Sequence, residues 1–311
     1  MIQEQIVIGA NTKYPLKGLL TLPAAAAKPV PAVVFVHGSG ANNMDEKVGK
    51  LTPFKDLANG LARHGIASIR YDKRTFAHGL KMLRDKLLEV TVKTETIDDA
   101  VLATEILKKD ARIDPEQVFI AGHSMGGMLA PRIDSEGGNY KGLIILAGSP
   151  RRLEEIMLDQ NKELLHGSKG LVRWIIEKQV SKFEELFHGL YQLSDEEAKK
   201  QKLGGGATLY YFKEMGEHPA SDYLTALAKP ILIMQGEKDF QATAHQDFDA
   251  YKQLLAGKDN VTFRLYENLN HAFVPSVYGD IRKAKQEYGV EQHISESVIS
   301  DIATWIHTAG A

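Results

Sequence analysis

Ser124 lies in the motif Gly-His-Ser-Met-Gly-Gly at residues 122–127, the most informative short stretch of the chain. An apolar run at residues 118–121 precedes the motif, and another at residues 128–130 follows it. This context predicts a strand, a tight turn carrying Ser124 and then a helix. Glycine is needed two residues before and two residues after Ser124, because any side chain there would collide with the neighbouring strand or helix. A serine oxygen exposed at a helix N-terminus is placed for nucleophilic attack, since the helix dipole and free N–H groups favour developing negative charge.

A serine hydroxyl is a weak nucleophile at neutral pH, so it needs an adjacent base, and the base needs an orienting carboxylate. Asp239 follows the apolar run at residues 231–234, and His271 follows the run at residues 261–266. Each candidate lies just past the end of a predicted strand, where open α/β sheets place their sites. The sequence therefore predicts a catalytic triad of Ser124, Asp239 and His271, in that chain order.

Other residues could fill the roles of acid and base. Glu237 could be the acid, but it lies two residues nearer the strand, so Asp239 has the better position in the loop. The remaining candidate bases fall at the start of one predicted helix or on the final one: His245, His293 and His307. Because His271 lies in a strand-to-helix loop, the position favours His271 as the base.

Two backbone N–H groups are expected to hold the oxyanion of a tetrahedral intermediate. One is the N–H of Met125, the residue after the nucleophile. The other is assigned to Ser39, with Gly40 as the alternative, in the loop His-Gly-Ser-Gly that follows the apolar run at residues 33–36. Glycines in this loop let the backbone approach a substrate closely. Removing one such donor typically costs about 2.7–4 kcal/mol of transition-state stabilisation.

The apolar pattern alternates between strands and helices along most of the chain. Strands are predicted at residues 6–8, 18–22, 31–36, 66–71, 118–121, 143–147, 230–234 and 261–266, the first two as an antiparallel hairpin. Amphipathic helices are predicted around residues 48–61, 97–107, 248–255 and 298–306. The alternation predicts an α/β fold with a mostly parallel central sheet and helices on both faces.

Residues 151–223 break this rhythm, because they contain charged helical stretches and no convincing buried strand. We predict a helical cap inserted after the sixth main strand, between the core segments 1–150 and 224–311. Residues 204–206, all glycine, could be a hinge, although a plain flexible turn is the simpler interpretation. The aromatic residues of this segment could line an acyl pocket or simply pack the cap onto the sheet: Trp174, Phe183, Phe187, Tyr191, Tyr210, Tyr211 and Phe212.

Taken together, these motifs resemble those of the α/β-hydrolase superfamily, in particular its bacterial carboxylesterase, dienelactone-hydrolase-like and serine-aminopeptidase-like branches. The motifs that carry the resemblance lie at residues 37–40, 122–127, 236–239 and 270–273. The resemblance implies the α/β-hydrolase fold and a Ser-His-Asp hydrolase that uses no metal and no organic cofactor.

The chain departs from the family pattern in two places. Its oxyanion loop lacks the form with three consecutive glycines that hormone-sensitive-lipase-like esterases have. In the turn that resembles the family's Asp-x-Arg-Gly, Thr75 replaces the glycine, and Asp72 and Arg74 are expected to form a structural ion pair.

Composition excludes several classes of protein. The 311 residues are 43% hydrophobic and carry a formal net charge of −2, which gives no electrostatic footprint for nucleic acid. The absence of cysteine excludes disulfides, cysteine-ligated zinc and a cysteine nucleophile. No apolar run approaches the length of a membrane span, and no signal peptide is visible, so a cytoplasmic protein is expected.

The expected reaction is hydrolysis of small carboxylic esters with short to medium acyl chains, through an acyl-enzyme. The same triad could serve a peptidase, a thioesterase or an acyltransferase. A non-catalytic binding protein on this fold would typically have lost a member of the triad, and this chain keeps all three. The chain could also form a homo-oligomer.

Overall fold

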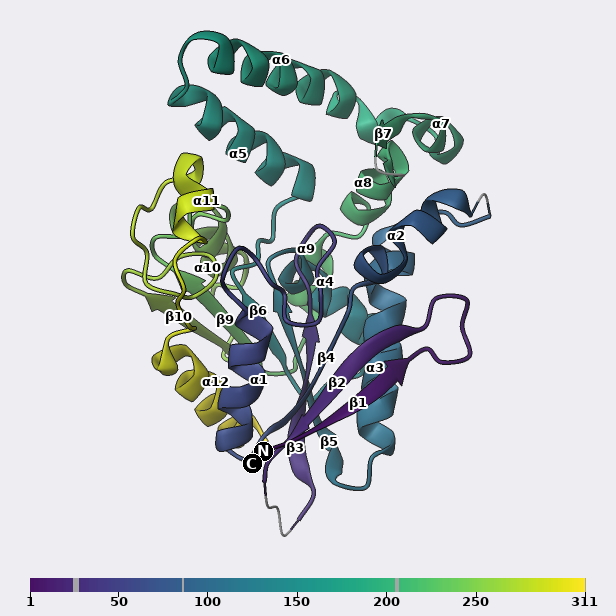
Figure 1. The fold of residues 1–311 in the computed structure, drawn as a ribbon, viewed down its shortest axis with the longest axis vertical. Helices are drawn as coiled ribbons and strands as arrows, with labels where there is room; N and C mark the ends of the chain where they lie inside the picture. Colours follow the sequence, from purple (N-terminus) through teal and green to yellow (C-terminus); the bar gives the residue numbers. More distant parts are fainter. Residues whose placement is uncertain (25–27, 86, 205–206, 311) are drawn as a thin grey trace.

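The computed structural model describes residues 1–24, 28–85, 87–204 and 207–310 (Figure 1). The strands are β1 (Ile2–Ile8), β2 (Leu16–Leu22), β3 (Val30–Val36), β4 (Ala67–Tyr71), β5 (Ile113–His123), β6 (Leu143–Leu146), β7 (Lys202–Gly204), β8 (Ala207–Thr208), β9 (Ile231–Gly236) and β10 (Val261–Tyr266). The helices are α1 (Pro53–Arg63), α2 (Arg74–Arg84), α3 (Asp98–Lys109), α4 (Met125–Ile133), α5 (Leu153–His166), α6 (Gly170–Phe187), α7 (Asp195–Lys200), α8 (Leu209–Gly216), α9 (Ala220–Ala226), α10 (Asp249–Leu254), α11 (Ala284–Glu287) and α12 (Glu296–Ala309). Short 3₁₀ or π segments cover Lys93–Ile97, Asp134–Gly138, Leu190–Gln192, Ala244–Phe248 and Ile281–Lys283.

The central sheet has the strand order β1-β2-β4-β3-β5-β6-β9-β10. The pairs β1–β2 and β2–β4 are antiparallel, and every pair from β4 through to β10 is parallel. The prediction of a mostly parallel α/β sheet is therefore confirmed. The opening hairpin is confirmed as well, and it is longer than expected, because Ile2 already pairs with Leu22.

Strand β3 shows why both faces of the sheet are covered. Successive side chains of a strand point to opposite faces. Val34 and Val36 pack in the hydrophobic cluster that also contains the buried residues of α3 and α4. Val33 and Phe35 pack in the cluster that contains the buried residues of α1 and α12. Because both faces are buried, the strand reads as a continuous apolar run.

Helix α1 begins later than its apolar spacing predicted. Val48 and Leu51 form an isolated bridge with each other instead of a helical turn. Pro53 then opens the helix at its first position, where the fixed φ of proline suits the helix and no N–H is needed.

Helices α5 to α8 lie between β6 and β9 in the sequence, and α5 and α6 run side by side at one end of the molecule (Figure 1). Leu153 and Pro219, at the two ends of this helical segment, line one cavity beside α4. The chain therefore enters and leaves the segment at one place. Helix α9 packs on α4 instead. The assignment of residues 151–223 as a separate cap stays a prediction. Of the glycine triplet only Gly204, the last residue of β7, is described; residues 205–206 lie outside the described residues.

None of the helices in the described ranges combines the length and the apolar character that a membrane crossing requires.

Candidate active site

The turn at Ser124 connects β5, which ends at His123, to α4, which begins at Met125. The strand, turn and helix predicted around the serine are thus confirmed. Ser124 has φ 53° and ψ −120°, a backbone conformation that costs free energy in a residue with a side chain. Its N–H donates to the carbonyl of Leu146 at 2.8 Å, and its own carbonyl accepts from the N–H of Gly127 at 2.9 Å. These bonds hold the strained turn against β6 and at the head of α4.

The glycines around the turn are required by close backbone contacts. A Cβ at Gly122 would lie 2.1 Å from the carbonyl oxygen of Gly126. A Cβ at Gly126 would lie 2.2 Å from the carbonyl oxygen of Val36, on the neighbouring strand. Both distances are far below van der Waals contact, so any side chain would force the strand and the helix apart.

Asp239 and His271 meet although 32 residues separate them in the chain. Asp239 follows β9, His271 follows β10, and His271 Nδ1 lies 2.7 Å from Asp239 Oδ2. The same carboxylate oxygen accepts from Gln235 Nε2 at 2.6 Å. The other oxygen accepts from the N–H groups of Gln241 and Ala242 at 2.7 and 3.1 Å. These contacts fix the orientation of a buried carboxylate, and that carboxylate fixes the ring of His271.

Ser124 and His271 line one small cavity of about 50 Å³, together with Ser39 and Met125. No hydrogen bond joins the Ser124 hydroxyl to His271 in the described part of the chain, and such bonds are often long in unliganded enzymes. Met125 is the first residue of α4, so its N–H has no partner within the helix. Gly40, the alternative donor, has φ +86° and does not line the cavity.

The other candidates lie elsewhere. The side chain of Glu237 is 44% exposed, whereas that of Asp239 is fully buried. His245 lines a different cleft, His293 pairs with Asp56, and His307 contacts the carbonyl of His64. The structure therefore brings together Asp239 and His271, and it places these alternatives outside the cavity of Ser124.

Helix α5 supplies an apolar wall of the small cavity through Leu153, Ile156 and Met157, and α4 adds Met128. The aromatic residues considered above are not among the described residues that line it. Trp174 is half-exposed, and the rings of Phe187 and Phe212 pack edge-on at 5.0 Å. Phe187 and Phe212 therefore pack against each other within the helical segment, whereas Trp174 remains exposed to solvent.

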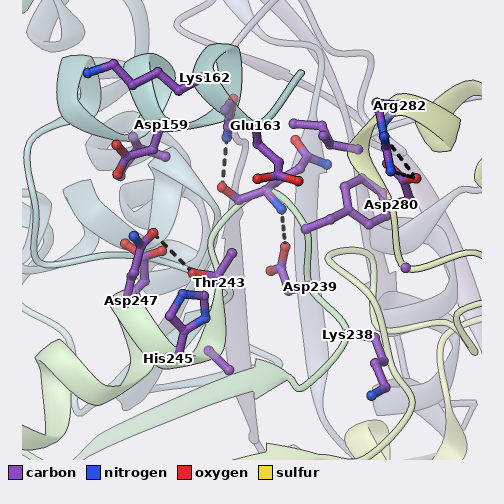
Figure 2. A pocket seen from close by; sticks show the side chains of 18 of the residues that line it. Asp159, Lys162, Glu163, Lys238, Asp239, Thr243, His245, Asp247, Asp280 and Arg282 are labelled. Carbon is purple, nitrogen blue, oxygen red and sulfur yellow. Dashed lines mark hydrogen bonds and ion pairs between the residues drawn. The ribbon is translucent and has the colours of Figure 1, made fainter. Parts of the chain in front are cut away.

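A larger cleft of about 830 Å³ adjoins the small cavity. Figure 2 shows charged side chains facing one another across it from α5, from the loop after β9 and from the segment around Arg282. The two cavities share Gln160 and Gln241 in their walls, and Gln160 Nε2 donates to the carbonyl of Gln241 at 2.9 Å. Among the described residues, no cluster of three or more histidine, aspartate or glutamate side chains could hold a metal ion.

Residues 27–275 match the family model described as serine aminopeptidase, S33. This chain belongs to the S33 serine aminopeptidase family. Esterase EstD of Thermotoga maritima is 36% identical to it over 291 residues, which cover 94% of this chain and 65% of the relative. The chain thus spans less than two-thirds of that relative's length.

Solved structures share the fold of this S33 family member. An esterase of Pyrococcus furiosus, PF2001, has a TM-score of 0.57 at 14% identity, covering 100% of this chain and 92% of that one. Est1E of Butyrivibrio proteoclasticus has 0.56 at 16% identity, covering 96% and 99%. A proline iminopeptidase of Mycobacterium smegmatis has 0.58 at 14% identity, covering 99% and 98%. The resemblance to the α/β-hydrolase superfamily predicted from the motifs is confirmed.

Sequence reasoning missed a buried ion pair beside the site of this S33 family member. Glu46 and His123 are 6% and 9% exposed, and Glu46 Oε2 lies 2.9 Å from His123 Nδ1, although not in hydrogen-bonding alignment. Glu46 Oε1 accepts from the N–H of Gly38 at 2.7 Å, and His123 Nε2 lies 2.9 Å from the carbonyl oxygen of His271. The pair therefore connects the loop after β3 to the loop that carries His271.

Each member of this pair keeps the other charged. Burial disfavours the charge on His123, but the Glu46 carboxylate and the His271 carbonyl outweigh it and raise the pKa of His123. Burial likewise disfavours the Glu46 carboxylate, but His123 and the N–H of Gly38 outweigh it and lower the pKa of Glu46.

Glu46→Gln is expected to destabilise the protein in a pH-dependent way. A raised histidine pKa adds stability below its ordinary value near ~6.5, and this is lost as pH rises through the raised value. A lowered carboxyl pKa adds stability above its ordinary value near ~4.3, and this is lost as pH falls through the lowered value. Both contributions are fully present between about pH 4.3 and about pH 6.5. The variant should therefore lose the most unfolding free energy in this range, about 1–3 kcal/mol.

Thermal unfolding of both proteins from about pH 4 to about pH 9 measures this difference. Glu105→Gln, which removes an exposed i,i+4 pair with Lys109, is the matched control and should change stability little. A destabilisation of Glu46→Gln that is constant across the pH range would contradict the prediction.

The predicted ion pair between Asp72 and Arg74 is wrong. Arg74 binds both carboxylate oxygens of Asp99 on α3, at 3.0 and 2.5 Å. Asp72 instead accepts from the N–H of Met44 at 2.8 Å. The reason is that Arg74 begins α2, where its side chain turns towards α3.

Proposed function

We propose that this protein is a carboxylesterase-type serine hydrolase that cleaves small esters with short acyl chains through an acyl-enzyme. The observation that carries the proposal is the 2.7 Å contact between His271 Nδ1 and the buried carboxylate of Asp239, at a cavity that both His271 and the strained Ser124 line. The 36% identity to an esterase supports the reaction class.

In the proposed mechanism, the oxygen of Ser124 attacks the ester carbonyl carbon while His271 Nε2 takes the hydroxyl proton. Asp239 holds Nδ1–H and stabilises the imidazolium that forms. The N–H groups of Ser39 and Met125 bind the oxyanion. The tetrahedral intermediate then expels the alcohol, which receives its proton from His271. Water attacks the acyl-enzyme by the same route and releases the carboxylic acid and free Ser124.

Two cavities meet at Ser124 and suggest where each half of the ester binds. We place the acyl group in the small cavity of about 50 Å³, against the apolar wall that contains Leu153 and Met157, where there is room for only a few heavy atoms. We place the alcohol in a second cavity of about 110 Å³, which also reaches Ser124 and His271 and is lined by Asn42 and Tyr288.

An aminopeptidase is the second candidate, because the charged cleft next to the small cavity contains Asp159 and Glu163, which could bind a substrate amine. Asp159 is, however, already paired with Arg151, and Lys162 and Arg282 line the same cleft. Because Arg282 pairs with Asp280 and Lys162 with Glu184, these cations do not neutralise Glu163, and the preference for the esterase rests on the 36% identity to an esterase.

Kinetics on p-nitrophenyl acetate, butyrate and octanoate, beside aminoacyl anilides and acyl-CoA, test the proposal together with fluorophosphonate labelling. We expect the highest kcat/KM on acetate or butyrate, and a single adduct that mass spectrometry locates on Ser124. Faster cleavage of the anilides would favour the aminopeptidase, and a protein that takes no label would favour a non-catalytic binder.

A further inference from the structure

Lys73 is a buried lysine that the proposed mechanism does not use. It lies directly before α2 and is only 1% exposed. Its Nζ donates to the carbonyl oxygen of Gly38 at 2.9 Å and lies 3.5 Å from Glu95 Oε1. Lysine is almost never fully buried unless it is paired, so this ammonium group is held at a free-energy cost that its contacts must offset.

The carbonyl that Lys73 binds belongs to the peptide unit that carries the N–H of Ser39. In a trans peptide the C=O and the following N–H point in opposite directions. None of the described peptide bonds is cis. Lys73 therefore fixes where the N–H of Ser39 points, which is away from Lys73. Ser39 lines the cavity of Ser124, so the direction of this N–H matters for an oxyanion there.

The loop is held from the opposite side as well. The N–H of Gly38 donates to the buried carboxylate of Glu46 at 2.7 Å, so residue 38 has an anion on its N–H and a cation on its C=O. Asn42 Nδ2 adds a contact to the carbonyl of Ser39 at 3.1 Å. A Cβ at Gly38 would lie 3.1 Å from the Cβ of Ser124, so a side chain in this loop would press against the nucleophile.

The ammonium group is itself fixed by Glu95. The Glu95 carboxylate accepts from Thr75 Oγ1 at 2.8 Å and from the hydroxyl of Tyr211 at 2.7 Å. A cation bound to a carbonyl also polarises the amide and makes its N–H a stronger donor. Lys73 thus affects both the direction of the Ser39 N–H and its strength as a donor.

We propose that Lys73 is a positioning residue for the oxyanion hole: by binding the carbonyl of Gly38, it aims and strengthens the N–H of Ser39 that stabilises the transition state. This inference rests on the proposed function, because it assumes that Ser124 forms a tetrahedral intermediate. Lys73 acts through the peptide of residues 38 and 39 and does not touch the substrate.

Lys73→Met tests the inference, because methionine fills similar space and cannot donate. A full oxyanion donor is worth about 10²–10³-fold in kcat, so a misaimed and weakened donor should cost about 10- to 100-fold in kcat on p-nitrophenyl acetate. The KM should stay within about twofold, because ground-state binding does not use this N–H. The affinity for a trifluoromethyl ketone, whose adduct with serine carries an oxyanion, should fall by the same factor as kcat.

Lys108→Met is the matched control, since Lys108 also donates to backbone carbonyls, those of Gly138 and Asn139, away from the cavity. It should keep the wild-type kcat and ketone affinity. If Lys73→Met does not fold, the charge-balanced double variant Lys73→Met/Glu95→Gln takes its place, with the same expected losses.

The outcomes separate the two proposals. Failure of fluorophosphonate to label Ser124 in the wild type would overturn the proposed function and this inference with it. Wild-type labelling at Ser124, combined with a folded Lys73 variant that keeps the wild-type kcat and ketone affinity, would overturn the role of Lys73 alone.

Discussion

Replacing Ser124 with alanine is expected to remove nearly all ester hydrolysis while leaving the fold intact. The loss in kcat should be on the order of 10⁶-fold, because the nucleophile and its base act as one unit. The hydroxyl has no hydrogen-bond partner among the described residues, so its removal leaves no buried group unsatisfied. Steady-state hydrolysis of p-nitrophenyl acetate, with thermal unfolding as the check on folding, measures both effects.

Ser221→Ala is a suitable control, because Ser221 lies on α9, and its side chain contacts Asp222 and not the cavity of Ser124. This variant should hydrolyse the ester at the wild-type rate. A folded Ser124→Ala protein with substantial activity would show that another group is the nucleophile, and the proposed mechanism would fall.

Asp239→Asn should lower kcat about 10⁴-fold by imposing the wrong histidine tautomer. The N–H groups of Gln241 and Ala242 both donate to Oδ1, so an asparagine must keep its carbonyl oxygen there. Its amide NH₂ then faces His271 Nδ1, which must become the acceptor. The ring proton consequently moves to Nε2, the nitrogen that has to accept the proton of Ser124.

Ester kinetics of Asp239→Asn, with NMR of the imidazole nitrogens, would detect both the loss and the tautomer change. Asp134→Asn is the matched control, because Asp134 is also a buried carboxylate that accepts from a backbone N–H, that of Tyr140, away from the cavity. It should affect stability more than kcat. A kcat of Asp239→Asn within about tenfold of the wild type would argue against a role for Asp239 in orienting His271.

The residues of the candidate triad could be predicted because their signals are local. Ser124 is surrounded by glycines that a strained turn requires, and Asp239 and His271 each follow an apolar run that reads as a strand. The order of strands then brings these loops to one edge of the sheet. The strand order alone predicts that the three side chains meet, without any distance between them.

The groups that hold the oxyanion loop gave no such signal. Lys73 contacts the carbonyl of Gly38 from 35 residues away, and Glu46 faces His123 from 77 residues away. A lysine or glutamate in a polar stretch reads as solvated surface, and only the three-dimensional structure shows that both are buried. The same applies to Arg74, whose partner Asp99 lies 25 residues away on α3, whereas Asp72 is only two residues away in the chain.

Helix α2 was not predicted from the sequence. Its large apolar residues Phe76, Leu80 and Leu83 are 52%, 73% and 51% exposed. Phe76, Leu80 and Leu83 recur at the i, i+4, i+7 spacing of an amphipathic helix, yet this apolar stripe is exposed rather than packed on the sheet. No helix was predicted for this segment, whereas the buried helices α3 and α12 were predicted near their observed positions.

Helices α5 to α8 are joined to the rest of the chain by two connecting segments, one near Leu153 and one near Pro219, which lie next to each other. A block attached at a single point can be gained, lost or swapped by recombination without breaking the β6–α9–β9 crossover. Because α5 of this block forms part of the wall over Ser124, such an exchange would alter which acyl groups fit and leave the nucleophile and its base untouched. The exchange would affect the oxyanion loop only indirectly, because Tyr211 of α8 donates to Glu95, the carboxylate beside Lys73.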